Sequence, residues 1–162
     1  MAETLGSLVD KLSIKNLRIW HLDEALEDEG TSASKRQELQ AKRDLADSQR
    51  QELAKEIDGF LGAALRGEVR IRDEKIKMYT NTNVSSSEAI KELGRAVSEL
   101  ASRNIKIWHL EDEVRRTDLP DATIVQTKRK IDTTNQERND LMDKVDEILL
   151  KHSTTTSRRG NE

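Results

Sequence analysis

The sequence predicts an all-α fold in which two tandem antiparallel helical hairpins form a four-helix bundle with internal pseudo-two-fold symmetry. Apolar residues recur at helical spacing in four long segments, which predicts four amphipathic helices. A short break separates the two helices of each pair, as is typical of antiparallel neighbours. The symmetry is predicted by a repeat, because IKNLRIWHLDEAL at residues 14–26 returns in similar form as SRNIKIWHLEDEV at residues 102–114.

The first hairpin is predicted to span residues 1–65. Its first helix, near residues 5–28, carries leucine and isoleucine at helical spacing. The break EDEGTSAS then supplies a glycine and a Ser/Thr cluster, which favour the end of one helix and the capped start of the next. A second helix is therefore expected near residues 33–65.

The second hairpin is predicted over residues 88–151, with helices near 88–116 and 121–151. The break between them, RTDLPDA, contains the only proline of the chain. Residues 66–87 are expected to form a linker with short extended segments, because apolar residues alternate there. Residues 152–162 are polar and are expected to be a disordered tail.

The repeat extends well beyond the two similar segments. A shift of 88 positions aligns residues 5–61 with 93–149 without a gap. Such a constant register predicts a tandem duplication. The identical pairs include Leu5/Leu93, Gly6/Gly94, Asn16/Asn104, Trp20/Trp108, His21/His109, Arg50/Arg138 and Leu61/Leu149.

Composition excludes several classes of function. The formal net charge of −3 gives no overall field that attracts nucleic acid or an anionic membrane. No apolar stretch approaches the roughly 20 residues that span a bilayer, and the N-terminus does not resemble a signal peptide. We therefore expect a cytoplasmic protein without a nucleic-acid or membrane partner. With 34% hydrophobic and 36% charged residues, each helix has a thin apolar stripe, which favours a homo-oligomer.

Polar residues interrupt the predicted apolar stripes at repeated positions. At about 100° per residue, one amide and one carboxylate fall inside the stripe of the first helix of each hairpin. One arginine falls within about 20° of the buried direction of each second helix. A buried arginine must be paired and hydrogen-bonded, so we expect a polar layer across the bundle. Its members are Asn16, Asp23 and Arg50 in the first repeat and Asn104, Glu111 and Arg138 in the second.

Three interpretations of this layer remain open. It can set the register of the helices, as buried polar residues do in coiled coils. It can instead line a ligand pocket with tryptophan walls, or be partly exposed without a special role. The candidate ligand-binding residues are Asn16, Trp20, Asp23, Arg50, Asn104, Trp108, Glu111 and Arg138.

The two repeated histidines, His21 and His109, are predicted to point about 160° away from the stripe centre. They share that side with Ile14, Leu17 and Ile105, which favours a self-association seam that weakens when the histidines are protonated. An acid follows each histidine by three residues, but no further histidine is well placed for a metal. No phosphate loop, G-x-S-x-G or H-E-x-x-H motif is present. We therefore predict no catalytic residue, metal or cofactor.

The segment RNIKIWHLEDEVRRTDLPDATIVQTKRKIDTTNQERNDLMDKVDEIL at residues 103–149 resembles the bacterial family catalogued as domain of unknown function 4254. TLGSLVDKLSIKNLRI at residues 4–19 is also similar to a segment of this family, with Leu5 in place of proline. In the first repeat, DSQRQEL at residues 47–53 replaces the Asn-x-x-Arg-Asn-Asp run, so only one repeat is expected to be competent if that run is functional. The matched residues of the longer segment are Asn104, Trp108, Glu111, Asp112, Arg115, Lys128, Arg129, Ile131, Asp132, Asn135, Arg138, Asn139 and Asp140.

The resemblance implies an all-helical bacterial protein of unassigned activity, whose relatives are often encoded near glycan-assembly genes. Two functions follow from the sequence. The first is a non-enzymatic binding or scaffold module that self-associates. The alternative is an enzyme or ligand-binding protein of bacterial surface-glycan synthesis that uses the Asn/Trp/acid/Arg layer and works with glycan-assembly proteins.

Overall fold

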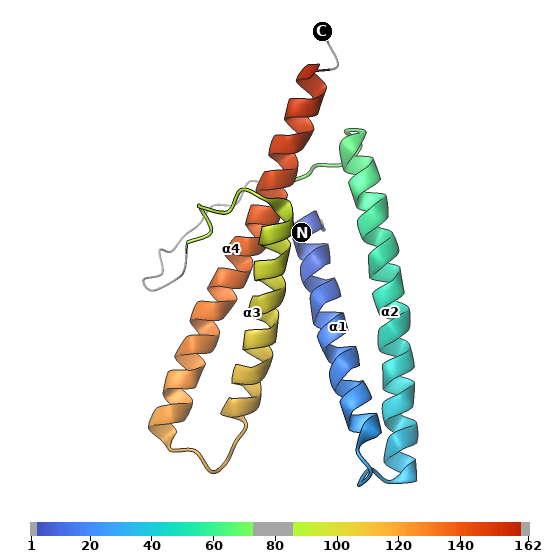
Figure 1. Cartoon of the computed structure of the whole chain (residues 1–162), viewed down its shortest axis with the longest axis vertical. Coiled ribbons are helices and arrows are strands. Elements are labelled where there is room, and N and C mark those ends of the chain that lie inside the picture. The colour runs from blue at the N-terminus through green and yellow to red at the C-terminus, as the bar shows by residue number, and fades with distance from the viewer. Residues whose placement is uncertain (1–2, 73–85, 160–162) are drawn as a thin grey trace.

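A computed structural model of the chain describes residues 3–72 and 86–159. These ranges contain four α-helices and no strand: α1 (Leu5–Glu27), α2 (Ala33–Leu65), α3 (Leu93–Val114) and α4 (Asp121–Arg159). Figure 1 shows that α1 and α2 form one antiparallel hairpin and that α3 and α4 form the other. The predicted all-α class and the two hairpins of a helical bundle are confirmed.

Local side-chain hydrogen bonds fix where the helices of the first hairpin begin. Thr4 caps α1 through a reciprocal capping box, in which Ser7 N–H donates to Thr4 Oγ1 at 3.3 Å and Thr4 N–H donates to Ser7 Oγ at 2.9 Å. Ser32 caps α2 by accepting from Lys35 N–H at 3.2 Å. The Arg36 guanidinium donates to two carbonyl oxygens at the end of α1 and so ties the turn together.

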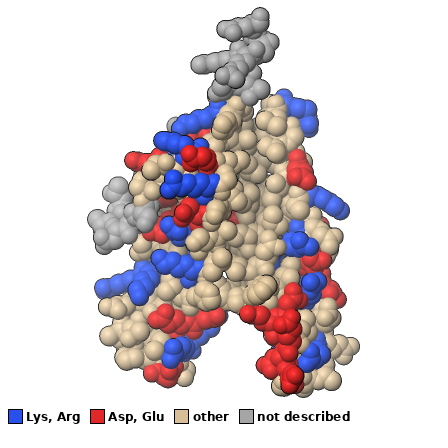
Figure 2. Space-filling view, viewed as in Figure 1, with Lys and Arg blue, Asp and Glu red and all other residues tan. Residues whose placement is uncertain are grey.

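The helices do not contact one another equally. α1 packs against all three other helices, whereas α2 packs chiefly on α1. Of the side chains of α2, only Ala46 and Ala64 are buried. Figure 2 shows that the hairpins separate at the end that carries their turns and leave a notch there. α2 is therefore an outer helix, and α1 joins the two hairpins.

The hydrophobic core lies where α1, α3 and α4 meet. Leu8, Leu100 and Val145 are almost fully enclosed. The largest cluster of buried side chains also receives one residue each from the ends of the connection between the hairpins, Ile71 and Ile90. The core is thus built mainly by the second hairpin with the first helix of the chain laid against it.

The close approach of α1 to α4 depends on Gly6. A Cβ atom at this position would lie 2.2 Å from the backbone oxygen of Met142. The amide of Gly6 donates to Asp146 Oδ1 at 2.7 Å, and Asp146 is 1% exposed. The free N–H groups and the positive dipole at the start of a helix both favour a carboxylate. Asp146 of α4 therefore holds the N-terminus of α1 in place.

The repeat is visible in the helix boundaries but not in the surroundings of the repeated residues. Both first helices and both second helices begin 88 residues apart, at Leu5 and Leu93 and at positions 33 and 121. A Cβ atom at Gly94, however, would meet nothing within 4 Å, in contrast to Gly6. The internal pseudo-two-fold symmetry of the bundle therefore stays a prediction.

Two helix boundaries and one expected extended segment differ from the prediction. α3 begins at Leu93 rather than near residue 88, because Ile90 N–H closes a turn on Ser87 O at 3.1 Å. α4 continues to Arg159 and so includes most of the expected tail, since no proline or glycine interrupts it before residue 160. No strand forms over residues 66–72, and the rest of the predicted extended segments falls largely outside the described residues. Within the described ranges, no helix is sufficiently long and apolar to cross a membrane.

Candidate functional site

A cavity of about 190 Å³ lies where α1, α3 and α4 face one another. Four of the eight predicted ligand-binding residues line it, and all four come from the second repeat: Asn104, Trp108, Glu111 and Arg138. Arg115 of α3 and the apolar side chains Ile14, Leu17 and Ile107 complete the lining. The structure thus brings the amide, the aromatic ring, the acid and the arginine of one repeat together.

A buried aspartate organises the inner wall of this cavity. Asp10 of α1 is 4% exposed and accepts a hydrogen bond from Asn104 Nδ2 at 2.9 Å. Its Oδ1 also lies 3.2 Å from Nε of Arg138. The Nε–H bond of Arg138 is not directed at this oxygen, so the contact is an ion pair without a hydrogen bond. Nε therefore has no hydrogen-bond acceptor among the described residues. Three helices are joined here by one carboxylate.

Several polar groups of the cavity have capacity left for a ligand. Within the described part of the chain, the Glu111 carboxylate makes no hydrogen bond or ion pair, and Asn104 uses only its Nδ2 group. The guanidinium of Arg138 donates from Nη1 to Asn135 at 3.3 Å, and no described residue accepts from its Nη2. Arg115 pairs with Asp112 at 3.1 Å and is 70% exposed. The cavity therefore offers both unpaired donors and unpaired acceptors.

One aromatic wall of the cavity is fixed by contact between the hairpins. The imidazole of His21 stacks on Trp108 with ring centroids 4.3 Å apart and planes inclined by 5°. His21 Nδ1 also lies 2.9 Å from Glu24 Oε2. One face of the His21 ring is thus used within the chain, while His109 is exposed, and the expected self-association seam with two histidines stays a prediction.

Two predicted members of the layer, Arg50 and Asp23, are not in it. Arg50 is 41% exposed and pairs with Asp47 on its own helix, with Nη2 and Oδ1 2.7 Å apart. Asp23 accepts from Arg43 Nε at 2.9 Å at the edge of the first hairpin. Because α2 packs chiefly on α1, no third helix covers this side and these charges reach solvent.

The other two predicted residues of the first repeat, Asn16 and Trp20, lie in a different place. Both are exposed, Trp20 by 64%, and both line a groove of about 410 Å³ between α1 and α3. Asn16 was expected inside the apolar stripe. α1 lies between two neighbours and buries two separate faces, and Asn16 falls on the open side between them. The expected burial of this amide is therefore wrong.

Sequence reasoning missed Asp10, the residue that holds the inner wall together. A single aspartate among the many acids of so charged a chain carries no periodic signal. One usable signal existed, because Asp10 lies in TLGSLVDKLSIKNLRI, the segment that resembles the family at its N-terminus. The repeat could not show it, since the equivalent position carries Ser98.

Charge pairs elsewhere support the second hairpin rather than a site. Arg103 of α3 bridges Glu99 at 3.0 Å and the largely buried Glu137 of α4 at 2.7 Å. Hydrogen bonds from Lys144 and then Lys151, together with their positive charges, lower the pKa of Glu147 to about 2. In the described residues, no three His, Cys, Asp or Glu side chains gather as a metal site would require.

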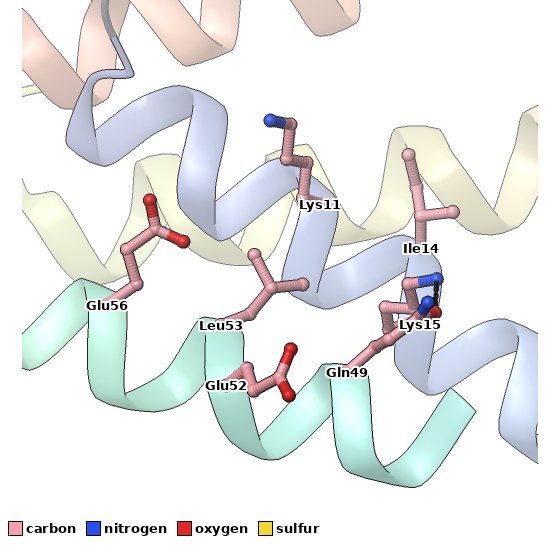
Figure 3. A pocket seen from close by; sticks show the side chains of 7 residues that line it. All are labelled: Lys11, Ile14, Lys15, Gln49, Glu52, Leu53 and Glu56. Carbon is pink, nitrogen blue, oxygen red and sulfur yellow. Dashed lines mark hydrogen bonds between the residues drawn. The ribbon is translucent and has the colours of Figure 1, made fainter. Parts of the chain in front are cut away.

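A third hollow, of about 330 Å³, lies between α1 and α2 (Figure 3). α1 contributes two lysines and Ile14, and α2 contributes Gln49, Leu53 and two glutamates. Lys15 Nζ donates to Gln49 Oε1 at 2.5 Å across the hollow. α1 supplies positive charge and α2 negative charge. We therefore interpret this surface as the contact between the two helices of the first hairpin rather than as a ligand site.

The fold and the cavity define an all-helical protein whose two hairpins enclose a small polar site. The chain matches the family described as protein of unknown function (DUF4254) over residues 1–72 and 94–162, and it belongs to this family. No curated protein and no solved structure matches the chain. The family resemblance found in the sequence is confirmed.

Proposed function

We propose that this protein is a non-enzymatic helical binding module that self-associates in the cytoplasm. The observation that supports this proposal is the uncharged groove between α1 and α3. Its nine lining residues include no charged side chain, in a chain of which 36% is charged. They are Val9, Leu12, Ser13, Asn16, Leu17, Trp20, Val97, Ala101 and Ile105. Figure 2 shows an uncharged band along the middle of one face, with charges at its sides.

A second copy of the chain suits this groove because its two walls share repeat-related positions. The three residues that α3 supplies, Val97, Ala101 and Ile105, are the repeat positions of Val9, Ser13 and Leu17 on α1. A two-fold axis in a dimer places the same patch of both subunits in contact. In such a dimer, α1 of each subunit can pack against α3 of the other subunit. Trp20 would be the buried aromatic anchor that such interfaces favour.

The oligomeric state tests this proposal. We expect sedimentation equilibrium to give a dimer for the native chain and a monomer for Trp20→Glu, since a charge buried in an apolar interface is costly. Leu45→Glu is the matched control, because Leu45 is 61% exposed on α2 and lies outside the groove. A native chain that stays monomeric at every concentration overturns the proposal, and so does a Trp20→Glu variant that dimerises like the native chain.

The second candidate is a ligand-binding role in bacterial surface-glycan synthesis, with glycan-assembly proteins as partners. The observation that favours a ligand-binding role is that the Asn/Trp/acid/Arg set of the second repeat lines one cavity. The glycan setting is what the family resemblance implies. A melting screen with nucleotide sugars and divalent metals tests it, and a rise in melting temperature that Arg138→Met removes would support it.

A further inference from the structure

The charges around the cavity are unevenly balanced. Arg138 lies 3.2 Å from Asp10, and Arg115 lies 3.1 Å from Asp112, so each arginine has a counter-ion. Glu111 has no counter-ion among the described residues. The uncompensated charge at this cavity is therefore negative, and a positively charged group beside Glu111 would be stabilised.

The unpaired hydrogen-bonding groups of the cavity nevertheless include both acceptors and a donor. The Glu111 carboxylate and the amide oxygen of Asn104 can only accept, and Nη2 of Arg138 can only donate. An N–H of a guanidinium forms a charge-assisted hydrogen bond with a carboxylate oxygen, so Nη2 of Arg138 suits a carboxylate of a ligand. A ligand that uses all these groups must carry a cationic donor and an anionic acceptor close together.

The remainder of the lining is apolar and the volume is small. Ile14, Leu17 and Ile107 face the cavity, and the stacked His21 holds the ring of Trp108 in place. The volume of about 190 Å³ lies below the roughly 300–1,000 Å³ of pockets for drug-sized molecules. A nucleotide sugar could place only one end there, whereas a molecule with one short apolar group fits.

We propose that this cavity is a binding site for a small amino acid with an apolar side chain. Its ammonium group pairs with Glu111, its carboxylate pairs with Arg138, and its side chain lies against the isoleucine and leucine wall. The proposal rests on the ligand-binding role of the cavity. It does not require self-association through the Trp20 groove, with which the cavity shares Leu17.

Isothermal titration calorimetry of the full chain tests the proposal in two steps. The first step screens glycine, L-alanine, L-valine, L-leucine, L-isoleucine and L-methionine, and we expect at least one to bind. The second step compares the bound amino acid with its two truncated forms, for L-valine isobutylamine without the carboxylate and isovalerate without the ammonium. Each truncated form should bind at least roughly tenfold more weakly, because a hydrogen bond to a charged group contributes more than one tenfold step in affinity.

Variants assign the two charges to residues. Glu111→Gln should weaken binding of the amino acid by roughly tenfold and leave binding of isovalerate unchanged. This variant should fold because Glu111 has no partner to lose among the described residues. Arg138→Gln should weaken the amino acid and leave isobutylamine unchanged. The matched controls are Glu29→Gln and Arg18→Gln, which remove the same charges from exposed positions outside the cavity.

Three results would overturn the proposal: no heat with any of the six amino acids, isovalerate binding as tightly as L-valine, or binding of UDP-glucose or inorganic phosphate without binding of an amino acid. The titration is repeated on Trp20→Glu. Binding that survives in the monomeric variant separates the cavity from self-association, so failure of one idea does not hide failure of the other.

Discussion

Replacing Gly6 by alanine should disrupt the contact through which the first helix is attached to the rest of the protein. The new Cβ atom would lie 2.2 Å from the carbonyl oxygen of Met142, and ordinary contact begins near 3.4 Å. α1 would have to move by about 1.2 Å, and backbone rather than a flexible side chain blocks the way. The same movement stretches the 2.7 Å hydrogen bond from Gly6 N–H to Asp146.

The expected cost combines these two effects. Overpacking a core costs about 1–3 kcal/mol, and weakening a hydrogen bond to a buried charged group costs up to about 1.5–3 kcal/mol. Alanine in place of glycine in a helix returns about 1 kcal/mol. We expect a net loss of about 2–4 kcal/mol in the free energy of unfolding. For a chain of this length that corresponds to a fall of roughly 5–15 °C in melting temperature.

The repeat supplies a matched control for this experiment. Gly94 is the equivalent second residue of α3, and a Cβ atom there meets nothing within 4 Å. Gly94→Ala should therefore raise stability by about 0.5–1 kcal/mol. Urea unfolding followed by far-UV circular dichroism at one protein concentration measures both variants. Equal stability of the two variants would refute the close packing of α1 on α4.

Three further predictions concern the charges and rings of the site. Asp10→Asn should lower the free energy of unfolding by about 2 kcal/mol, less than the 3–5 kcal/mol of a fully buried pair because Arg138 is 26% exposed, and urea unfolding measures it. Glu147 has a folded pKa of about 2, below its unfolded value of 4.5, so its stabilising effect is complete above pH 4.5 and is lost as the pH falls toward 2. Glu147→Gln should flatten the acid limb of a plot of stability against pH, and an unchanged limb contradicts this. His21→Ala should change the fluorescence of Trp108 and lower stability by about 0.5–1.5 kcal/mol, and a silent variant argues against the stack.

The helices and their pairing could be predicted from the sequence because long-range periodicity and turn residues carry that information. The face of α1 that is buried could not be predicted in this way. The leucine stripe gives one buried direction, but α1 contacts helices on two sides, so Asp10 is buried while Asn16 is exposed. A helical wheel shows the periodicity of one helix. It cannot show that a helix distant in the sequence packs against a second face.

The same reason explains why the predicted site residues come together in the second repeat and not in the first. Asn104 and Arg138 lie where α1 closes over α3 and α4, so their polar groups meet a third helix. Arg50 is the repeat equivalent of Arg138, but its helix, α2, has only one close neighbour. Identical residues therefore acquire different environments, and only tertiary packing decides between them.

The dependence of α2 on one neighbour has a consequence for how the molecule opens. Proteins unfold locally in cooperative units, and units with few buried contacts open at the lowest free energy. α2 has 33 residues but buries only two alanines, whereas α4 lies in the core with Val145 and Ile148. The amide hydrogens of α2 should exchange with solvent well before those of α4, through an opening that leaves the α3–α4 hairpin folded. Detachment of α2 as a unit would uncover the outer side of α1 and would remove only Ala64 from the cluster of buried core residues.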